Sequence, residues 1–588
     1  MKLNLEFYKK DIFYKQIKNE DKIIEYISQN EGENYSHIIK EDNSEEVLTT
    51  LSDIRKNIVY AYDFKPDCTI LEVGAHFGEI TGALCEKSSR VVSVEFNKKS
   101  GEVIAKRHFD KPNLEIIIGK LTEIEWKEKF DYIVLNGIVE YAQKLYDSKT
   151  PVLDLIEEVK KTLKEEGRLL IATDNKFAMK SYIGDTDECT SITFDSITGY
   201  KSSKKTYKLG KKELEKILQE AGFNNYKFLY PLPDYKLVSL VFSDEYLPSS
   251  SKINGYFPYY QDESSIFYSE VDAYDAIIKE NKEMFPFFAN SFFIEAGMQK
   301  VENDTQYISF NNYRKPKYQL MTKIRKDVVE KTAIGKQAKE HFDNMVKNIE
   351  DLKSENIEIL DEVQEGKTVS KFINTKLASQ MISDNRENPE EILKILNWYK
   401  ETIEKNAIPY TEGMKTVFET YVPQVDKAII EQFHYLKHGY WDMILKNCFI
   451  LDNKCVFFDQ EWKEENVPVE FLIYRSIVNI EKIRSKIEEY GLFEKMGIKD
   501  YISVFEQLDR ALAEEIMDKE IYGFYQKKHK NPIYDNYNLK QENEKLQEEK
   551  AELKQEVEQL TAKLNDIYQS KSWQTAQKIE RIKNKFKG

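Results

Sequence analysis

Between residues 69 and 173, short apolar runs alternate with helical stretches, and this alternation constrains the fold more than any other feature of the sequence. The apolar runs are Thr69–Val73, Val91–Glu95, Leu114–Ile118, Tyr132–Leu135 and Arg168–Thr173. Runs of this length, separated by helices, favour a parallel sheet that is covered on both faces. We therefore expect an α/β domain over residues 56–246, closed by a helix at 213–222 and a strand hairpin at 226–243.

The first apolar run leads directly into a glycine-containing loop that ends at Gly78 and opens a helix. Glycines at 74 and 78 let a ligand approach the backbone, and the start of the next helix offers N–H donors. Glu95 ends the second run, where a carboxylate can accept hydrogen bonds from ribose hydroxyls. The loop and the acidic strand end together indicate a site for a nucleotide-like ligand.

On these residues, the segment 50–245 resembles the class I S-adenosylmethionine-dependent methyltransferases. The first motif of that family reads acidic-x-Gly-x-Gly-x-Gly, and here His76 replaces the middle glycine. A second departure is Lys120, which stands where the family usually has an acid near the adenine. The resemblance implies a Rossmann-like fold and S-adenosylmethionine as the cofactor. The residues that it implies for cofactor binding are Glu72, Gly74, Gly78, Glu95 and Asn136.

Two alternatives stay open for this domain: a Rossmann-like fold that binds another nucleotide, or one that has lost its activity. An NAD site is disfavoured because the Gly-x-Gly-x-x-Gly pattern is absent. On the acceptor side, residues 174–177 follow the fifth run, and Tyr182, Asp187 and Glu188 come soon after. His76 is a candidate base for a hydroxyl acceptor, or simply packs beside the loop.

A second constellation begins at Asp442, which precedes Asn447 by five residues. Asp459 then follows the short apolar run 455–458. This spacing resembles the active site of the protein-kinase-like fold, in which one carboxylate positions the acceptor hydroxyl. The resemblance implies an α+β domain over 301–530, ATP as a ligand, and Mg²⁺ held by Asn447 and Asp459.

The same resemblance implies that Lys331, at the end of an apolar run, reaches the ATP phosphates and acts with Asp442 in catalysis. Glu340 is the expected partner of Lys331, Arg314 is a candidate phosphate ligand, and 362–369 is the expected hinge between two lobes. The usual Asp-Phe-Gly is replaced by Asp-Gln-Glu, and no glycine-rich loop precedes Lys331. The alternative is a pseudokinase, which keeps the fold without the transfer.

A heptad repeat follows at 534–570. Apolar residues recur every seven positions: Leu539, Leu546, Leu553, Leu560 and Ile567. Three residues before each stand Asn536, Asn543, Lys550, Val557 and Leu564. This pattern predicts a coiled coil that joins copies of the chain, as a dimer or a trimer. The tail 571–588 is basic and amphipathic with one Trp, which is typical of a membrane-surface or partner-docking helix.

The expected layout is therefore N-terminal helices (1–55), a methyltransferase domain (56–246), a connector (247–300), a kinase-like domain (301–530), a coiled coil and a tail. The formal net charge of −15 over 588 residues argues against a nucleic-acid partner. Five cysteines without CxxC spacing, and no apolar leader or spanning run, favour the cytoplasm. The tail would place part of the protein at the inner membrane face.

This layout resembles the bifunctional methyltransferase/kinases that terminate O-antigen chains. The resemblance implies that a lipid-linked or polysaccharide glycan is phosphorylated and then capped by methylation. It also implies a glycosyltransferase as a partner. Two alternatives remain: a methyltransferase on another acceptor with an inactive kinase-like domain, and a non-enzymatic scaffold for glycan assembly.

Overall fold

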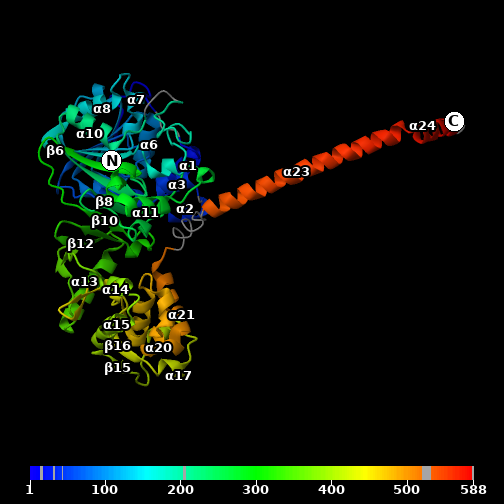
Figure 1. Ribbon diagram of the computed structural model, residues 1–588. Coiled ribbons are helices and arrows are strands. Elements are labelled where there is room, and N and C mark those ends of the chain that lie inside the picture. Colours follow the sequence, from blue (N-terminus) through cyan, green and yellow to red (C-terminus); the bar gives the residue numbers. More distant parts are fainter. Residues whose placement is uncertain (14–16, 31–33, 43, 203–206, 519–531, 586–588) are drawn as a thin grey trace.

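The computed structural model describes residues 1–588 except 14–16, 31–33, 43, 203–206, 519–531 and 586–588. Figure 1 shows a larger N-terminal body, a smaller body below it, and a long C-terminal helix that projects to one side. One continuous sheet of 14 strands runs through both bodies. Among the described residues, no helix is both long and apolar enough to cross a membrane.

The larger body is built on the strand order β1-β4-β3-β2-β5-β6-β9-β7-β8. Its strands are β1 (Lys2–Asn4), β2 (Thr69–Val73), β3 (Arg90–Glu95), β4 (Leu114–Ile118), β5 (Phe130–Asn136), β6 (Leu163–Asp174), β7 (Asn225–Leu232), β8 (Leu240–Ser243) and β9 (Ser291–Gly297). The strands β2 to β6 pair in parallel, as the apolar runs predict. The expected Rossmann-like sheet is confirmed.

Alternate residues of the central strands enter two different cores. Leu71 of β2 packs with α8 (Pro151–Lys160) and α10 (Lys211–Glu220). Its neighbour Ile70 packs with α4 (Asn57–Tyr60), α5 (Thr81–Lys87) and α6 (Lys98–Arg107) on the other face. Both faces of the sheet are therefore covered, which explains why its strands are apolar throughout.

Strand β9 lies between β6 and β7 and pairs antiparallel with both. It comes from the segment 247–300, which the sequence suggested to be a connector. All seven residues of β9 are buried, so this segment supplies a central strand of the first body. Before β9 the segment forms α11 (Glu270–Asn281) and α12 (Phe285–Phe288), which pack on the core of the first body. The expected boundary at residue 246 is therefore wrong.

The N-terminal segment contains an edge strand as well as helices. β1 pairs in parallel with β4, and α1 (Glu20–Gln29), α2 (Ser36–Asp42), α3 (Glu45–Leu51) and the 3₁₀ turn η1 (Asp53–Lys56) follow. The side chain of Ser44 caps α3, and the side chain of Ser52 caps η1, so these two elements are separate. These helices form a small core that includes Phe77 of the glycine loop.

The smaller body begins with an antiparallel part of the same sheet, in the order β10-β11-β12-β14-β13. The elements are β10 (Tyr307–Phe310), β11 (Leu320–Ile324), β12 (Val328–Ala333), α13 (Lys339–Ser354), β13 (Glu362–Gln364) and β14 (Lys367–Lys371). β10 pairs with β8, which joins the two bodies through backbone hydrogen bonds. The expected hinge at 362–369 is instead a hairpin of β13 and β14, with Gly366 at positive φ in its turn.

The rest of the smaller body is mainly helical and has its own core. Its helices are α14 (Ala378–Asp384), α15 (Pro389–Glu404), α16 (Val417–Tyr421), α17 (Lys427–Ile430), α18 (Val469–Val478), α19 (Arg484–Glu489), α20 (Leu492–Lys495) and α21 (Ile502–Ile516). Its short strands are β15 (Ile408–Pro409), β16 (His434–Tyr440), β17 (Cys448–Leu451), β18 (Lys454–Phe457) and β19 (Lys463–Pro468). The hairpin of β17 and β18 places Asp459 directly after its second strand.

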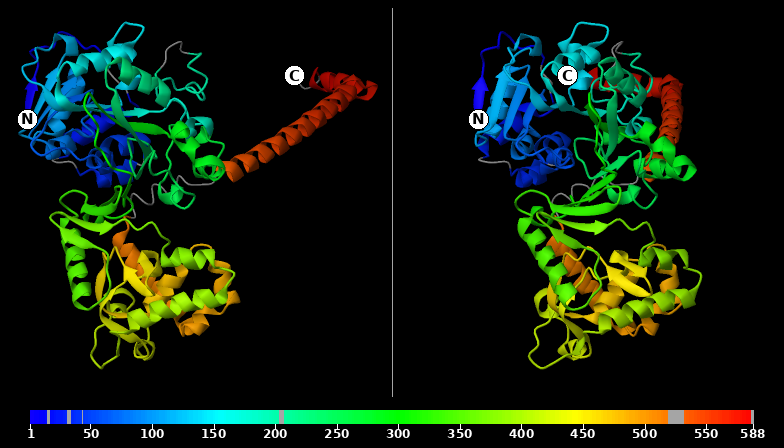
Figure 2. Two further views of the ribbon diagram at one scale, coloured as in Figure 1. Left: turned by 60° about the vertical axis from the view of Figure 1, so that its left-hand side comes forward. Right: turned by 90° about the vertical axis from the view of Figure 1, so that its left-hand side faces the viewer.

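The C-terminal helices are α23 (Pro532–Gln569) and α24 (Lys571–Lys585), and Figure 2 shows that α23 extends away from both bodies. The heptad residues from Leu546 to Ile567 are 50–61% exposed. The side chains of Asn536, Leu539 and Asn543 lie outside the described residues. In the tail, Trp573, Ile579 and Ile582 are exposed, and Phe586 falls outside the described residues.

Candidate functional site

The glycine loop lies at the carboxyl end of β2. Gly74 and Gly78 both have φ of +75°, a conformation that other residues seldom adopt. A Cβ atom on Gly74 would lie 2.8 Å from Cδ1 of Ile138. The backbone of the loop therefore requires glycine at these positions, at the edge of the sheet where ligands bind in such folds.

Two buried carboxyl groups border this loop. Glu72 accepts a hydrogen bond from Oγ1 of Thr81 at 2.8 Å, and burial raises the pKa of Glu72 to about 7. Glu95 ends β3 and accepts from the backbone N–H groups of His76 and Phe96. Burial raises the pKa of Glu95 to about 8. Glu95 therefore braces the glycine loop from the end of β3.

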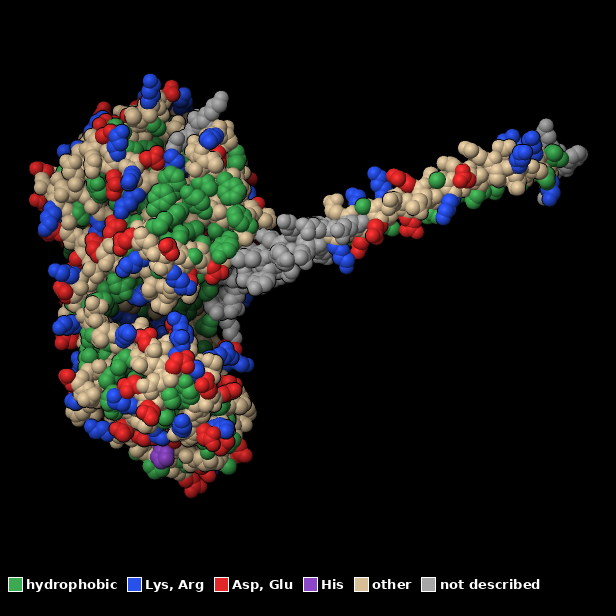
Figure 3. All heavy atoms as spheres, in the orientation of Figure 1, with side chains coloured by type: hydrophobic (Ala, Val, Ile, Leu, Met, Phe, Trp, Pro, Cys, Tyr) green, Lys and Arg blue, Asp and Glu red, His purple; other side chains and the backbone are tan. Residues whose placement is uncertain are grey.

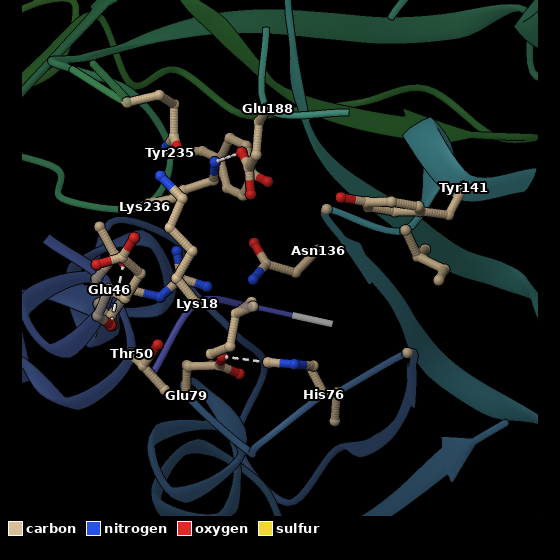
Figure 4. A pocket seen from close by; sticks show the side chains of 18 of the residues that line it. Lys18, Glu46, Thr50, His76, Glu79, Asn136, Tyr141, Glu188, Tyr235 and Lys236 are labelled. Carbon is tan, nitrogen blue, oxygen red and sulfur yellow. Dashed lines mark hydrogen bonds and ion pairs between the residues drawn. The ribbon is translucent and has the colours of Figure 1, made fainter. Parts of the chain in front are cut away.

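His76 also adopts a left-handed conformation, with φ of +52°. Its Nδ1 atom lies 2.9 Å from Oε1 of Glu79, and its ring stacks on Phe77. Although burial alone would raise the pKa of Glu79, the adjacent His76 helps to lower it to about 2. The imidazole is thus held by Glu79 at the base of the cavity, as Figure 4 shows.

A cavity of about 750 Å³ opens between the loop and the segments that face it. Its walls include Glu72, Gly74, Glu95 and Asn136, which are four of the five residues predicted to bind the cofactor. Gly78 does not line the cavity; a Cβ there would lie 2.8 Å from Nε2 of His108, so this glycine serves close packing. The Oδ1 atom of Asn136 is buried and has no hydrogen-bond partner among the described residues.

The wall opposite the loop carries the residues of the predicted acceptor side. Figure 4 shows Glu188, Tyr235 and Lys236 on the other side of Asn136 from His76 and Glu79, and Tyr141 beside Asn136. Lys236 forms an ion pair with Glu188, which fixes both side chains at the cavity. Asn175 bonds to backbone oxygens outside the cavity, so the segment after β6 contributes less than the sequence suggested.

A buried charge network supports this wall from behind. Lys208 bridges Asp174 at 3.4 Å and Asp187 at 3.1 Å, and Lys180 bridges Asp234 at 3.1 Å. Burial alone would raise the pKa of Asp174, but the surrounding lysines lower it to about 2. The network ties the segment after β6 to the 183–200 loop. The predicted acceptor residue Tyr182 instead faces outward and is exposed.

Sequence reasoning missed several residues of this cavity. Arg55, Thr50 and Lys18 come from the N-terminal segment, and Lys236 comes from the loop after β7. None of these residues belongs to a motif of fixed spacing, so only the three-dimensional arrangement identifies them. In the sequence, the charge of Lys236 and the acidic residues near 187 were the one signal that could have indicated this wall of the cavity.

In the smaller body, Lys331 of β12 forms an ion pair with Asp459 and lies 2.7 Å from Oε1 of Glu461. Glu461 is also paired with Arg314 and lies 3.2 Å from Nε2 of His341. Although burial alone would raise the pKa of Glu461, Arg314 and Lys331 hold it far below its ordinary value. The structure thus brings Lys331, Arg314 and Asp459 together as one charged cluster.

The expected partner of Lys331 was Glu340, and this prediction is wrong. Glu340 is the second residue of α13 and is exposed, one residue before the side chain that faces the cluster. That side chain is His341, and Glu461 occupies the place of the anion. Glu461 comes from the sequence Asp-Gln-Glu, in which it replaces the expected glycine.

Asp442 lies near this charged cluster, and Asn447 is bonded to Asp442. The side chain of Asn447 donates to the backbone oxygen of Asp442 at 3.0 Å, which braces this loop. Burial, and then the charge of Glu461, raise the pKa of Asp442 to about 6. Burial also raises the pKa of Asp459 to about 7, against the effect of Lys331. Within the described ranges, no three His, Cys, Asp or Glu side chains are grouped so as to hold a metal ion.

With this geometry established, comparison with known proteins is informative for the larger body. A family model described as a methyltransferase domain matches residues 64–222. Ribosomal RNA small subunit methyltransferase A of Geobacter metallireducens is 32% identical over 107 residues, 18% of this chain and 36% of that protein. Malonyl-[acyl-carrier protein] O-methyltransferase of Priestia megaterium is 26% identical over 111 residues, 19% of this chain and 38% of that protein.

The chain thus spans only about a third of the length of the curated relatives that it matches. Among solved structures, a TehB-like S-adenosylmethionine-dependent methyltransferase from Corynebacterium glutamicum covers 45% of this chain and 98% of its own. Its TM-score is 0.25 at 11% identity, and a likeness this distant says nothing of function. The family model and the sheet order show that the chain contains a class I S-adenosylmethionine-dependent methyltransferase domain.

Proposed function

We propose that this chain transfers the methyl group of S-adenosylmethionine to a bacterial cell-surface glycan, and that the cavity beside the glycine loop is the site of transfer. The observation that carries the donor assignment is the convergence of Gly74, Glu95 and Asn136 on one cavity within the matched domain. The cavity volume, about 750 Å³, suits S-adenosylmethionine together with part of an acceptor.

The residues present fit the donor. Glu95 is a buried carboxylate that can accept from two ribose hydroxyls, and Gly74 keeps the backbone open beside it. Asn136 stands between the loop and the opposite wall and has an unsatisfied buried oxygen. When bound, S-adenosylmethionine supplies an electrophilic methyl group on a sulfonium sulfur. The protein orients the acceptor against it and excludes water.

A hydroxyl acceptor must lose a proton during transfer, and Glu188 is placed to receive it. Its carboxylate faces the cavity and is oriented by Lys236. Glu188→Gln should therefore abolish methyl transfer while S-adenosylhomocysteine binds as tightly as before. Equal turnover by Glu188→Gln and the unaltered chain would contradict this role.

The glycan acceptor is supported by the chemistry of the opposite wall. Hydroxyl and carboxylate groups of Ser191, Thr193 and Asp262 line it, and such groups pair with sugar hydroxyls. One relative is a ribosomal RNA methyltransferase, but a chain of net charge −15 is a poor match for a polyanion. Labelled S-adenosylmethionine should methylate lipid-linked glycans of the source cell and leave its ribosomal RNA unlabelled.

A second candidate function, phosphoryl transfer to the same glycan, belongs to the smaller body. Two observations favour it: the strand order β10-β11-β12-β14-β13 with α13 between β12 and β13, and the meeting of Lys331 with Asp459. A lysine on the third strand and an aspartate after a hairpin form the ATP site of kinase-like folds. Mg²⁺ would be held by Asp459 and Asn447. If this function is correct, the protein should consume ATP when glycan is present. Binding of ATP without its consumption would favour a pseudokinase.

The C-terminal helices support a proposal of assembly and location. Six apolar side chains at heptad spacing are exposed along α23, and a second copy of the chain would bury them. α24 then presents Trp573, Ile579 and Ile582 together with Lys578 and Arg581, which suits an anionic membrane surface or a glycosyltransferase. Deletion of 571–588 should release the protein from membranes while the oligomer persists. Unchanged membrane association would contradict the anchoring role.

A further inference from the structure

Arg55 is a buried cation in the wall of the donor cavity. It lies on η1, is only 7% exposed and lines the cavity. Among the residues that the structure describes, its guanidinium forms no ion pair and no hydrogen bond, and its Nε atom is buried without a partner. Burying an unpaired guanidinium costs about several kcal/mol of folding free energy, as it does for other buried ions. A native anion is therefore expected beside it.

The neighbouring Arg107 shows what a structural arginine looks like in the same place. Arg107 is also buried, but its Nη1 atom donates to the backbone oxygens of Thr50 at 3.2 Å and Phe77 at 3.1 Å. Arg107 thus ties the N-terminal helices to the glycine loop. Arg55 has no such role, so its guanidinium is available to a ligand that enters the cavity.

The acidic residue Glu79 also fails to account for Arg55. Glu79 lies close enough for Arg55 to lower its pKa, yet its carboxylate is engaged by His76 at 2.9 Å. No ion pair joins Arg55 to Glu79 in the described part of the chain. Arg55 and Glu79 both line the cavity, and Figure 4 shows Glu79 beside His76, on the other side of Asn136 from Glu188 and Lys236.

We propose that Arg55 binds the carboxylate of the amino-acid part of S-adenosylmethionine, an inference that rests on the proposed donor site. A guanidinium offers paired N–H donors that match the two oxygens of a carboxylate. With Glu95 at the ribose end and Arg55 at the amino-acid end, the donor is fixed at both ends of the loop. The methyl group between them is then directed toward Asn136 and the acceptor wall.

The test compares two ligands by calorimetry with the full-length protein. S-adenosylhomocysteine carries the carboxylate, whereas 5′-methylthioadenosine keeps the ribose and adenine but lacks the amino-acid part. Arg55→Met should weaken S-adenosylhomocysteine binding about tenfold to a hundredfold, the loss of one or two charge-assisted hydrogen bonds. It should leave the affinity for 5′-methylthioadenosine unchanged within about twofold. Arg55→Lys, which keeps the charge without the paired donors, should fall between.

Arg90→Met is the matched control, because Arg90 pairs with Glu115 and Glu128 away from the cavity. Its affinity for both ligands should equal that of the unaltered chain. If Arg55→Met weakens the binding of both ligands equally, the assignment is wrong. It is also wrong if Arg55→Met weakens the binding of neither ligand, and Arg55 then serves an acidic acceptor. If the unaltered chain binds neither ligand, the donor site itself fails, which is a different outcome. Thermal unfolding of Arg55→Met confirms that the variant is folded.

Discussion

Replacing Glu95 by glutamine tests the donor site through its pH dependence. Glu95 is buried, and its pKa is raised to about 8. Ribose hydroxyls donate hydrogen bonds to the ionised carboxylate, so the donor should bind the ionised form best. A carboxyl group with a raised pKa is protonated below that value, and the affinity should therefore rise as the pH rises through 8.

The magnitude follows from the ionised fraction. With a pKa of about 8, this fraction is about 3% at pH 6.5 and about 76% at pH 8.5. If only the carboxylate binds, the affinity for S-adenosylhomocysteine should rise about 25-fold across this range, or about 1.9 kcal/mol. In Glu95→Gln the pH dependence due to this group should vanish. The variant should bind at least tenfold more weakly at pH 8.5 and within about threefold of the unaltered chain at pH 6.5.

The assay is isothermal titration calorimetry of the full chain with S-adenosylhomocysteine at pH 6.5, 7.5 and 8.5. The same series with 5′-methylthioadenosine removes the titration of the ligand's own amino group. Because the glutamine keeps the shape of the side chain, it can still accept from the N–H of His76 and hold the loop. A flat pH profile for the unaltered chain, or equal affinities of both proteins at pH 8.5, would refute the reasoning.

Three further perturbations address other parts of the molecule. Asp459→Ala should abolish Mg²⁺-dependent ATP turnover and leave S-adenosylhomocysteine binding within about twofold, because the two sites lie in separate bodies; calorimetry with each ligand measures both. Leu553→Asn with Leu560→Asn should shift the chain toward monomer in sedimentation velocity, and an unchanged oligomer would mean that α23 is not the interface. Asp174→Asn should destabilise the larger body by about 3 kcal/mol, because it leaves buried lysines uncompensated; urea unfolding at pH 7 measures this. The pKa of Asp174, about 2, lies below its ordinary value, so this difference should persist at neutral pH and shrink as the pH falls below 4.

The sequence predicted the central sheet well, because continuous apolar runs report burial on both faces and need no knowledge of partners. It also predicted which strand ends would meet: Gly74, Glu95 and Asn136 come from three different strands and line one cavity. Parallel strands bring their carboxyl ends to one edge, so this convergence follows from topology.

The errors have a common physical cause, since apolar periodicity shows that a segment is buried and does not show against what. Strand β9 was therefore taken for part of a connector, although it lies between β6 and β7, more than 50 residues away in the chain. In the same way, Glu340 has the spacing of a helical partner for Lys331, but Glu461, from a segment distant in the sequence, forms the ion pair. Arg55 belongs to no sequence motif, and it is identified as a candidate ligand-binding residue only because its buried guanidinium has no partner among the described residues.

Surface views add one feature that the sequence did not indicate. Figure 3 shows hydrophobic side chains gathered on the larger body, on the side toward the long helix. Exposed rings of the larger body include Phe194 and Phe267, whose centroids lie 6.1 Å apart, and Phe287. Phe194 directly follows Thr193, which lines the cavity, so the ring pair of Phe194 and Phe267 lies close to the proposed acceptor side.

The most direct measurement is a crystal structure of the full chain grown with S-adenosylhomocysteine. The account predicts the ligand in the cavity beside Gly74, with its ribose hydroxyls on the carboxylate of Glu95 and its sulfur facing Asn136. A ligand bound elsewhere, or a cavity that stays empty at saturating S-adenosylhomocysteine, would contradict the assignment of this cavity as the methyl-donor site.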